Sequence, residues 1–199
     1  MAIEVPGASR KDPVIVIAAD EHPRPDTTLE KLASLKPIYA GGVVTAGNAS
    51  GINDGAGALL LGCRDMGEKL GLQARARIIT GAVAGVDPRI MGLGPVPAAQ
   101  KALQRAGLAL KDMDVIEINE AFATQVLGVL KQLQLSMQDS RINPNGGAIA
   151  IGHPLGASGI RLILTAMRQL ERGKGRYALV SLCIGIGQGI ALILERVDK

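Results

Sequence analysis

Residues 143–159 read Asn143-Pro144-Asn145-Gly146-Gly147-Ala148-Ile149-Ala150-Ile151-Gly152-His153-Pro154-Leu155-Gly156-Ala157-Ser158-Gly159, and the chain is organised around this stretch. Its glycines and prolines are incompatible with a regular helix and predict a tight loop. From Ile160 onward apolar residues recur at helical spacing, which predicts that the loop leads into a helix packed inward. His153 is then placed where a neutral imidazole can accept a proton near pH 7. A tight turn with an incidental histidine is the alternative.

Length and composition indicate a packed globular protein. The chain has 199 residues, of which 47% are hydrophobic, enough for one large domain or one domain with an extension. Aromatic residues make up only 2%, which argues against stacking on nucleic acid. The net charge of +4 comes from scattered Lys and Arg residues, so we expect no nucleic-acid partner, although a polyanionic ligand remains compatible.

The cysteines and the ends of the chain bear on location. Cys63 and Cys183 do not make a disulfide framework, and their apolar or Gly-rich surroundings are typical of reduced intracellular thiols. We interpret Cys63 as an inert core thiol. The start lacks a signal-peptide core, and no apolar run reaches the length of a membrane span. The expectation is a cytoplasmic protein with no membrane contact and no metal site.

Strands and helices alternate along the chain. Residues 1–13 are expected to be an arm, and His22, in a proline-rich loop, an exposed turn residue. The Gly-rich turn 185–189 joins the last two strands and predicts an antiparallel hairpin. We predict an α/β domain whose mixed five-stranded sheet is covered by helices on both faces. The predicted strands are residues 14–18, 58–61, 77–86, 115–118, 176–182 and 190–194, and the predicted helices begin near residues 28, 95, 121 and 160.

Three loops at the ends of predicted elements carry functional side chains. Asn119, His153 and Cys183 are expected at one edge of the sheet, where ligands bind in such folds. A thiol, an imidazole and a carboxamide are a suitable set for acyl transfer, because they provide a proton carrier, a base and an oxyanion donor. The small residues of segment 41–57 would let the backbone lie against a ligand, or form a buried crossover.

Four segments together strongly resemble the thiolase family in order and spacing. They are residues 44–56, 119–123, 145–159 and 183–189. The resemblance runs from about Asp12 to Arg196 and corresponds to the C-terminal half of a usual thiolase. It implies that residues 1–50 are the end of the loop domain, 51–73 the last segment of the N-terminal domain, and 74–199 the C-terminal domain. The family's fold is five-layered, with two similar halves packed together.

The resemblance implies acyl transfer to and from coenzyme A. Thiolases condense two acetyl-CoA into acetoacetyl-CoA or cleave a 3-ketoacyl-CoA, so coenzyme A and acetyl-CoA would be substrates, with no covalently bound cofactor. Cys183 matches the cysteine that exchanges a proton with the α-carbon. His153 matches the histidine that activates the nucleophile and lines an oxyanion hole. Asn119 matches the residue that holds a water there, and the Gly185 N–H would bind the other oxyanion.

Further positions match the family's CoA-binding residues. Arg24 matches a position near the nucleotide, and Ala46 and Ser50 match positions beside the pantetheine. One departure is the absence of a counterpart to the cysteine that becomes acylated. The other is Ile186, where the family usually has glycine and where a branched residue does not easily adopt a positive φ.

The same resemblance implies partners, and it leaves two other interpretations open. A thiolase half exposes surfaces meant for the other half, so we expect a homo-oligomer or a partner chain that carries the N-terminal half. The chain could instead be a non-catalytic module that binds CoA or acyl-CoA, or a truncated inactive thiolase. A dinucleotide site at residues 185–189 is disfavoured, because that turn is predicted to link two strands.

Overall fold

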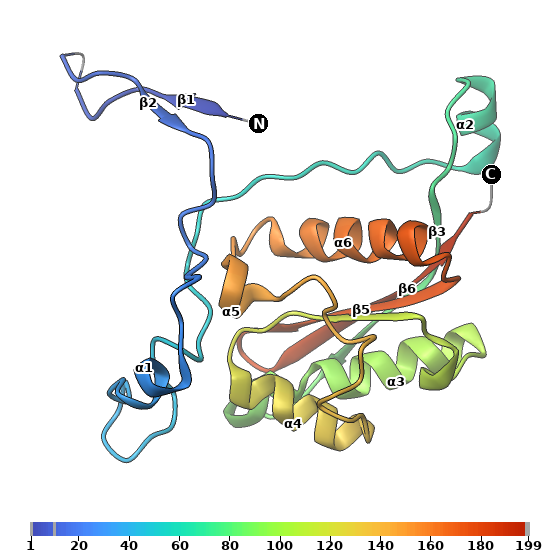
Figure 1. The fold of residues 1–199 in the computed structure, drawn as a ribbon. Coiled ribbons are helices and arrows are strands. Elements are labelled where there is room, and N and C mark those ends of the chain that lie inside the picture. The colour runs from blue at the N-terminus through green and yellow to red at the C-terminus, as the bar shows by residue number, and fades with distance from the viewer. Residues whose placement is uncertain (1, 10, 198–199) are drawn as a thin grey trace.

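The computed structural model describes residues 2–9 and 11–197 and contains a central mixed sheet (Figure 1). The strand order is β3-β6-β5-β4, with β4 and β5 parallel and the other neighbours antiparallel. The predicted hairpin at the end of the chain is confirmed as β5 and β6. The strands are β3 (Ala76–Gly85), β4 (Val115–Ile118), β5 (Tyr177–Ile184) and β6 (Gln188–Arg196).

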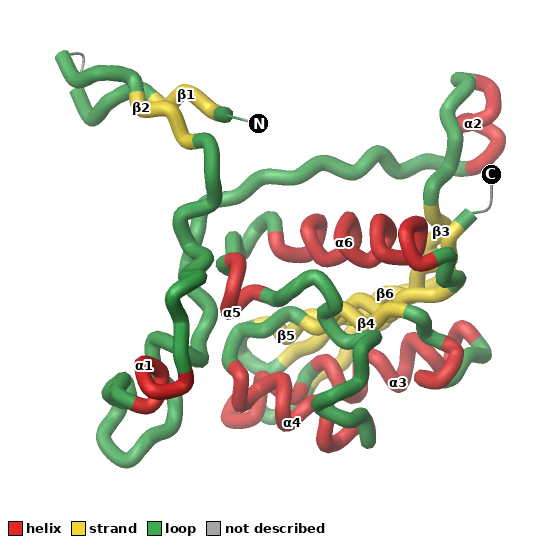
Figure 2. Tube along the Cα trace, viewed as in Figure 1, coloured by secondary structure: helices red, strands yellow, loops and turns green. Residues whose placement is uncertain are grey.

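Helices cover both faces of this sheet (Figures 1 and 2). Helix α6 (Ser158–Gly173) lies on one face, and α3 (Pro95–Ala106) and α4 (Ala123–Leu133) lie on the other. Alternate strand residues supply the two cores. Ile116, Leu179 and Ile193 belong to the core under α3 and α4, whereas Val115, Val180 and Leu194 belong to the core under α6. The predicted α/β class with both faces covered is confirmed.

The sheet has four strands within the described residues, not the predicted five. Residues 58–61, expected to be a buried strand, are extended but pair with no strand, and Leu60 and Leu61 are exposed. The reason is that this segment crosses the outer side of α6 (Figure 1), where Gly57 lies against Ile160. Helix α6 therefore separates the segment from the sheet. Cys63, which follows the segment, is exposed rather than in a core.

Residues 2–9 and 11–57 lie to one side of the sheet domain and form a longer arm than predicted (Figure 1). Strand β2 (Ile15–Ile17) confirms the predicted strand, and it pairs antiparallel with β1 (Ile3–Val5), which lies within the segment predicted to be an arm. Helix α1 (Leu29–Ala33) begins after Thr28, whose hydroxyl accepts the Lys31 N–H at 3.2 Å as an N-cap. Helix α2 (Arg64–Lys69) precedes β3.

Short helical turns complete the fold. They are the 3₁₀ segments η1 (Pro88–Leu93) and η2 (Leu110–Asp112) and the four-residue α5 (Ala148–Ile151), which lies within the loop that precedes His153. Among residues 2–9 and 11–197, no helix combines the length and the apolar character needed to cross a membrane. The same residues include no cluster of three or more His, Cys, Asp and Glu side chains suited to a metal ion.

Candidate active site

Asn119 and Cys183 lie at the same edge of the sheet. Asn119 directly follows β4, is 1% exposed, and donates its backbone N–H to the Ser181 carbonyl of β5 at 3.0 Å. Strand β5 continues from Ser181 to Cys183, which is half-buried. Because β4 and β5 are parallel, their carboxyl ends meet at one edge, where α/β proteins bind ligands.

The backbone of His153 is fixed by the arm. Its N–H donates to the Gly51 carbonyl at 3.0 Å and to Asn53 Oδ1 at 3.1 Å. Gly152 has a φ of 90°, a conformation that a residue with a Cβ rarely adopts, so glycine is required there. The expected tight loop before a helix is thus present, and the small-residue segment lies against it.

The hydrogen bonds of the imidazole determine its tautomer. Ser158 Oγ donates its single proton to the Pro154 carbonyl at 3.0 Å, so it accepts a hydrogen bond from His153 Nδ1 at 2.5 Å. We therefore assign the ring proton to Nδ1. The lone pair of Nε2 then faces the Asn119 side-chain Nδ2, which donates to it at 3.3 Å. The structure brings His153 to Asn119 and hence to the edge of the sheet where β5 leads to Cys183.

Burial shifts both titratable groups of the site toward their neutral forms. Burial, assisted by the positive charge of Arg161, lowers the pKa of His153, so its imidazole is neutral near pH 7. Burial also raises the pKa of the Cys183 thiol, which therefore holds its proton at neutral pH. The site combines a neutral base, a carboxamide and a protonated thiol, a set that can move protons next to a carbonyl compound.

Glu120 ties the histidine loop to the end of β4. Its carboxylate accepts the Asn143 side-chain N–H at 2.8 Å and the Ile149 backbone N–H at 3.2 Å. Asn143 in turn bonds both backbone groups of Ile118, at 2.8 and 2.9 Å. Gly147 approaches the Glu120 carboxyl so closely that a Cβ there would collide with it. These hydrogen bonds were not predicted from the sequence, because a role was assigned to the Asn119 side chain and none to that of Glu120.

The predicted pantetheine residues lie beside Asn119. Ser50 donates both its backbone N–H and its hydroxyl to the Ala121 carbonyl, at 3.0 and 3.1 Å, and the Ala46–Ser50 segment therefore runs along the start of α4. Arg24 lies elsewhere, exposed in the loop before α1, and none of the hydrogen bonds found among the described residues joins its side chain to the other predicted site residues.

The turn after Cys183 carries strain. Gly185 is exposed at the start of this turn, and Ile186 has a φ of 70° with 86% of its surface exposed. The branched side chain thus adopts the left-handed conformation that we expected it to avoid. The next residue, Gly187, has a φ of 101° and packs against the Val86 carbonyl, where a Cβ would collide.

Three contacts near His153 were not predicted. Asn53 and Ser158 hold its backbone and ring, and the only sequence signal was their position within small-residue segments. His22 is half-buried, not an exposed turn residue, because its Nε2 lies 3.1 Å from the Ile149 carbonyl oxygen and its Nδ1 lies 3.4 Å from Asn53 Nδ2. The arm thereby contacts the histidine loop through two side chains.

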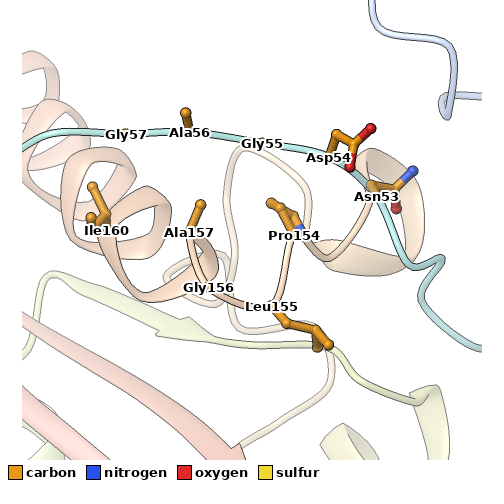
Figure 3. Close-up of a pocket in the computed structure, with 10 residues that line it drawn as sticks. All are labelled: Asn53, Asp54, Gly55, Ala56, Gly57, Pro154, Leu155, Gly156, Ala157 and Ile160. Atoms are coloured by element: carbon orange, nitrogen blue, oxygen red, sulfur yellow. The ribbon is translucent and has the colours of Figure 1, made fainter.

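A shallow cleft separates the arm from the loop that follows His153 (Figure 3). Its volume is about 320 Å³. Gly55 passes within 2.7 Å of the Pro154 side chain, measured from where a Cβ would stand, so only glycine allows this approach. The cleft is lined by residues 53–57 on one side and by Pro154, Leu155, Gly156, Ala157 and Ile160 on the other.

Two family models match the sequence: "Thiolase, C-terminal domain" over residues 72–196, and "Thiolase, N-terminal domain" over residues 3–65. The chain belongs to the thiolase family. Its Gly-rich turn at 185–189 joins β5 to β6, so it is a thiolase hairpin turn and not a strand-to-helix dinucleotide loop.

Known thiolases match nearly the whole chain. The 3-oxoadipyl-CoA/3-oxo-5,6-dehydrosuberyl-CoA thiolase of Escherichia coli (strain K12) is 60% identical over 190 residues, covering 95% of this chain and 47% of that protein. A beta-ketoadipyl-CoA thiolase of Acinetobacter baylyi is 59% identical, covering 94% of this chain and 47% of that protein. The chain therefore spans about half the length of these relatives.

Solved thiolase structures share the fold. Human mitochondrial 3-ketoacyl-CoA thiolase in complex with CoA is 52% identical with a TM-score of 0.88, covering 92% of this chain and 46% of that one. The Bacillus anthracis acetyl-CoA acetyltransferase is 44% identical with a TM-score of 0.92, covering 99% of this chain and 49% of that one. The thiolase fold of this chain is thus shown by structure as well as by sequence.

Proposed function

We propose that this thiolase chain supplies the proton-transfer half of an active site that moves acyl groups to and from coenzyme A. The observation that carries the proposal is the imidazole of His153, whose Nε2 lone pair is held by Asn119 at the sheet edge where β5 leads to Cys183. Preorganised donors at such an edge can stabilise the oxyanions formed in acyl transfer.

Each site residue receives a role in the cleavage of a 3-ketoacyl-CoA. A cysteine nucleophile would pass its proton to His153 and attack the 3-keto carbon, and the bond between carbons 2 and 3 would break to release the enolate of acetyl-CoA. Cys183, protonated at neutral pH because burial raises its pKa, would give its proton to carbon 2 of that enolate. The thiol of free CoA would then return a proton to Cys183 and take the acyl group, and the freed cysteine would recover its proton from His153. Asn119 and the Gly185 N–H would stabilise the negatively charged oxygens. Condensation is the reverse sequence.

Coenzyme A would bind along the arm as a substrate. Ser50 and Ala46, placed beside the start of α4, would contact the pantetheine, and the exposed Arg24 would meet the nucleotide phosphates. The relatives at 59–60% identity are named for 3-oxoadipyl-CoA or beta-ketoadipyl-CoA. We therefore place 3-ketoacyl-CoA esters with a distal carboxylate among the substrates.

The acylated cysteine would come from an N-terminal thiolase half. Neither Cys183, the proton carrier, nor the exposed Cys63 occupies a setting suited to that nucleophile. We assign residues 1–50 to the end of the loop domain, 51–73 to the end of the N-terminal domain and 74–199 to the C-terminal domain. The half-buried active-site edge would be completed by a partner chain or by oligomerisation, and we place the protein in the cytoplasm.

Reconstitution tests this proposal. The chain is co-expressed with the N-terminal half of the E. coli relative, and CoA-dependent loss of acetoacetyl-CoA and 3-oxoadipyl-CoA is measured. We expect turnover by the pair and none by either half alone. Cys183→Ala should abolish turnover, and Cys63→Ala, the matched control, should retain it because Cys63 is exposed and remote from the sheet edge.

Binding separates the proposal from its alternative. A folded pair that binds acetyl-CoA in a calorimetric titration yet turns over neither substrate would contradict the enzymatic role and favour the non-catalytic binding module. Turnover that survives Cys183→Ala would show that another group carries the proton.

A further inference from the structure

Two ionisable side chains lie behind the histidine loop, one of them buried and the other half-buried. Glu117, in β4, is 1% exposed, and Arg161 belongs to the first turn of α6. Val115 lies two residues before Glu117, on the same face of the strand, and packs in one core with Leu162 of α6. Glu117 therefore faces α6 next to Arg161.

Arg161 reaches the backbone of the catalytic loop. Its Nη1 donates a hydrogen bond of 2.5 Å to the carbonyl of Gly152. That carbonyl belongs to the peptide group that joins Gly152 to His153. Because this group is planar, the guanidinium holds the orientation of the backbone that carries the His153 side chain. The same end of α6 holds the ring itself through Ser158. Helix α6 thus sets both the backbone and the ring of His153.

Within the part of the chain that the structure describes, each of the two side chains has one buried atom without a hydrogen bond. Arg161 Nη2 and Glu117 Oε1 are both buried without a hydrogen-bond partner among the described residues. Burial lowers the pKa of Arg161, and the negative charges of Glu117 and Glu120 oppose that effect. Burying a polar group without a hydrogen bond costs stability, and apolar side chains would fill the space at lower cost. Stability of the fold alone does not explain the pair.

We propose that Arg161 is a positioning residue that holds the Gly152 carbonyl and thereby orients the His153 imidazole toward Asn119. The inference rests on the proposed function of His153 in acyl transfer. Arg161 acts through the backbone of Gly152 and is not itself placed against a substrate.

The charges around the imidazole come from three elements. Arg161 projects from α6, Glu117 from β4, and Glu120 from the segment between β4 and α4, whereas the ring's direct contacts, Asn119 and Ser158, are neutral. Of these charges, Arg161 lowers the pKa of His153. Removal of Arg161 is expected to raise the pKa of His153 and to release the Gly152 carbonyl from its hydrogen bond.

Nuclear magnetic resonance of the full chain tests the inference without turnover. The chain has two histidines, so the imidazole signals lost in His153→Gln identify those of His153. In Arg161→Gln we expect the His153 titration midpoint to rise and its backbone amide resonance to move. Arg168→Gln, the matched control at an exposed position of α6, should change neither. Coincident His153 signals in the two variants would overturn the inference.

A conservative variant covers the case in which Arg161→Gln does not fold. Arg161→Lys keeps the positive charge, so the His153 midpoint should stay near that of the wild type. A folded Arg161→Lys protein whose His153 midpoint rises well above that of the wild type would overturn the inference.

The reconstituted enzyme gives a second readout. Arg161→Gln should lower kcat, by up to about 10²-fold as expected for a displaced catalytic group, and leave KM within about twofold. Arg161→Lys should recover part of the loss. If the wild-type pair does not turn over, the proposed function fails while the resonance result stands. If it turns over and Arg161→Gln matches Arg168→Gln in kcat, the positioning role fails alone.

Discussion

Ser158→Ala removes the contact that selects the tautomer of His153. Ser158 is 0% exposed, and its hydroxyl accepts from His153 Nδ1 at 2.5 Å while it donates to the Pro154 carbonyl at 3.0 Å. Alanine fits the same space without either bond. The Pro154 carbonyl keeps the backbone N–H of residue 158 at 2.8 Å, so the imidazole N–H alone loses its partner.

The magnitude follows from that difference. A buried donor left without an acceptor costs about 1–3 kcal/mol, and the lost hydroxyl bond to a carbonyl that stays paired adds about 0.5 kcal/mol or more. We expect the free energy of unfolding to fall by about 2 kcal/mol. The ring proton should also redistribute to Nε2, which removes the lone pair that faces Asn119 and with it the basic site.

Urea unfolding followed by circular dichroism measures the stability, and long-range ¹H–¹⁵N correlation spectra report which ring nitrogen carries the proton. Ser136→Ala is the matched control, because that exposed hydroxyl accepts only the Gln138 N–H, at 3.1 Å. Its effect should stay within about 0.5 kcal/mol. A Ser158→Ala protein with unchanged stability and the proton still on Nδ1 would show that Ser158 does not select the tautomer.

Three further predictions concern the stability of the protein. Burial raises the pKa of Glu117 from 4.5 to about 7, so the native state retains a proton that the unfolded chain releases, and stability falls as pH rises through that range. Between pH 4.5 and 7.5, the free energy of unfolding of Glu117→Gln, measured with urea, should rise relative to that of the wild type by up to about 3 kcal/mol. A difference that stays constant over this pH range would contradict the raised pKa. Leu170→Ala, at a 0% exposed site, should cost about 3 kcal/mol in the same assay, and Leu155→Ala, at a 65% exposed site, close to none. Ile186→Gly should raise the free energy of unfolding by about 1 kcal/mol, because glycine adopts the φ of 70° without strain. A lower urea midpoint than that of the wild type would mean that the turn is unstrained.

The sheet domain could be predicted because its signals are local. Proline at the start and glycine after the end delimit α3, where Gly107 has a φ of 67°. Nearly continuous apolar runs mark β5 and β6, and the glycine-rich turn between them predicts a hairpin. The convergence of Asn119 with His153 was expected from the edge of an α/β sheet and from the family's motifs, and the 3.3 Å contact between them agrees with that expectation.

Other features depend on what lies between segments, which local patterns do not encode. Residues 58–61 have the composition of a buried strand, but α6 occupies the space between them and the sheet. The roles of Ser158 and Asn53 follow from distances across the fold, since a serine near the start of a helix is equally typical of a cap. The buried Glu117 was masked by its position within an apolar strand.

The hydrogen bonds from the His153 N–H to the Gly51 carbonyl and to Asn53 Oδ1 link the proposed base to the arm, which lies outside the sheet domain. Each local opening of residues 51–53 away from the domain would expose this amide hydrogen to solvent. The rate of deuterium exchange at the His153 amide therefore reports how often these hydrogen bonds open without global unfolding. A ligand that holds residues 51–53 against the histidine loop would slow this exchange.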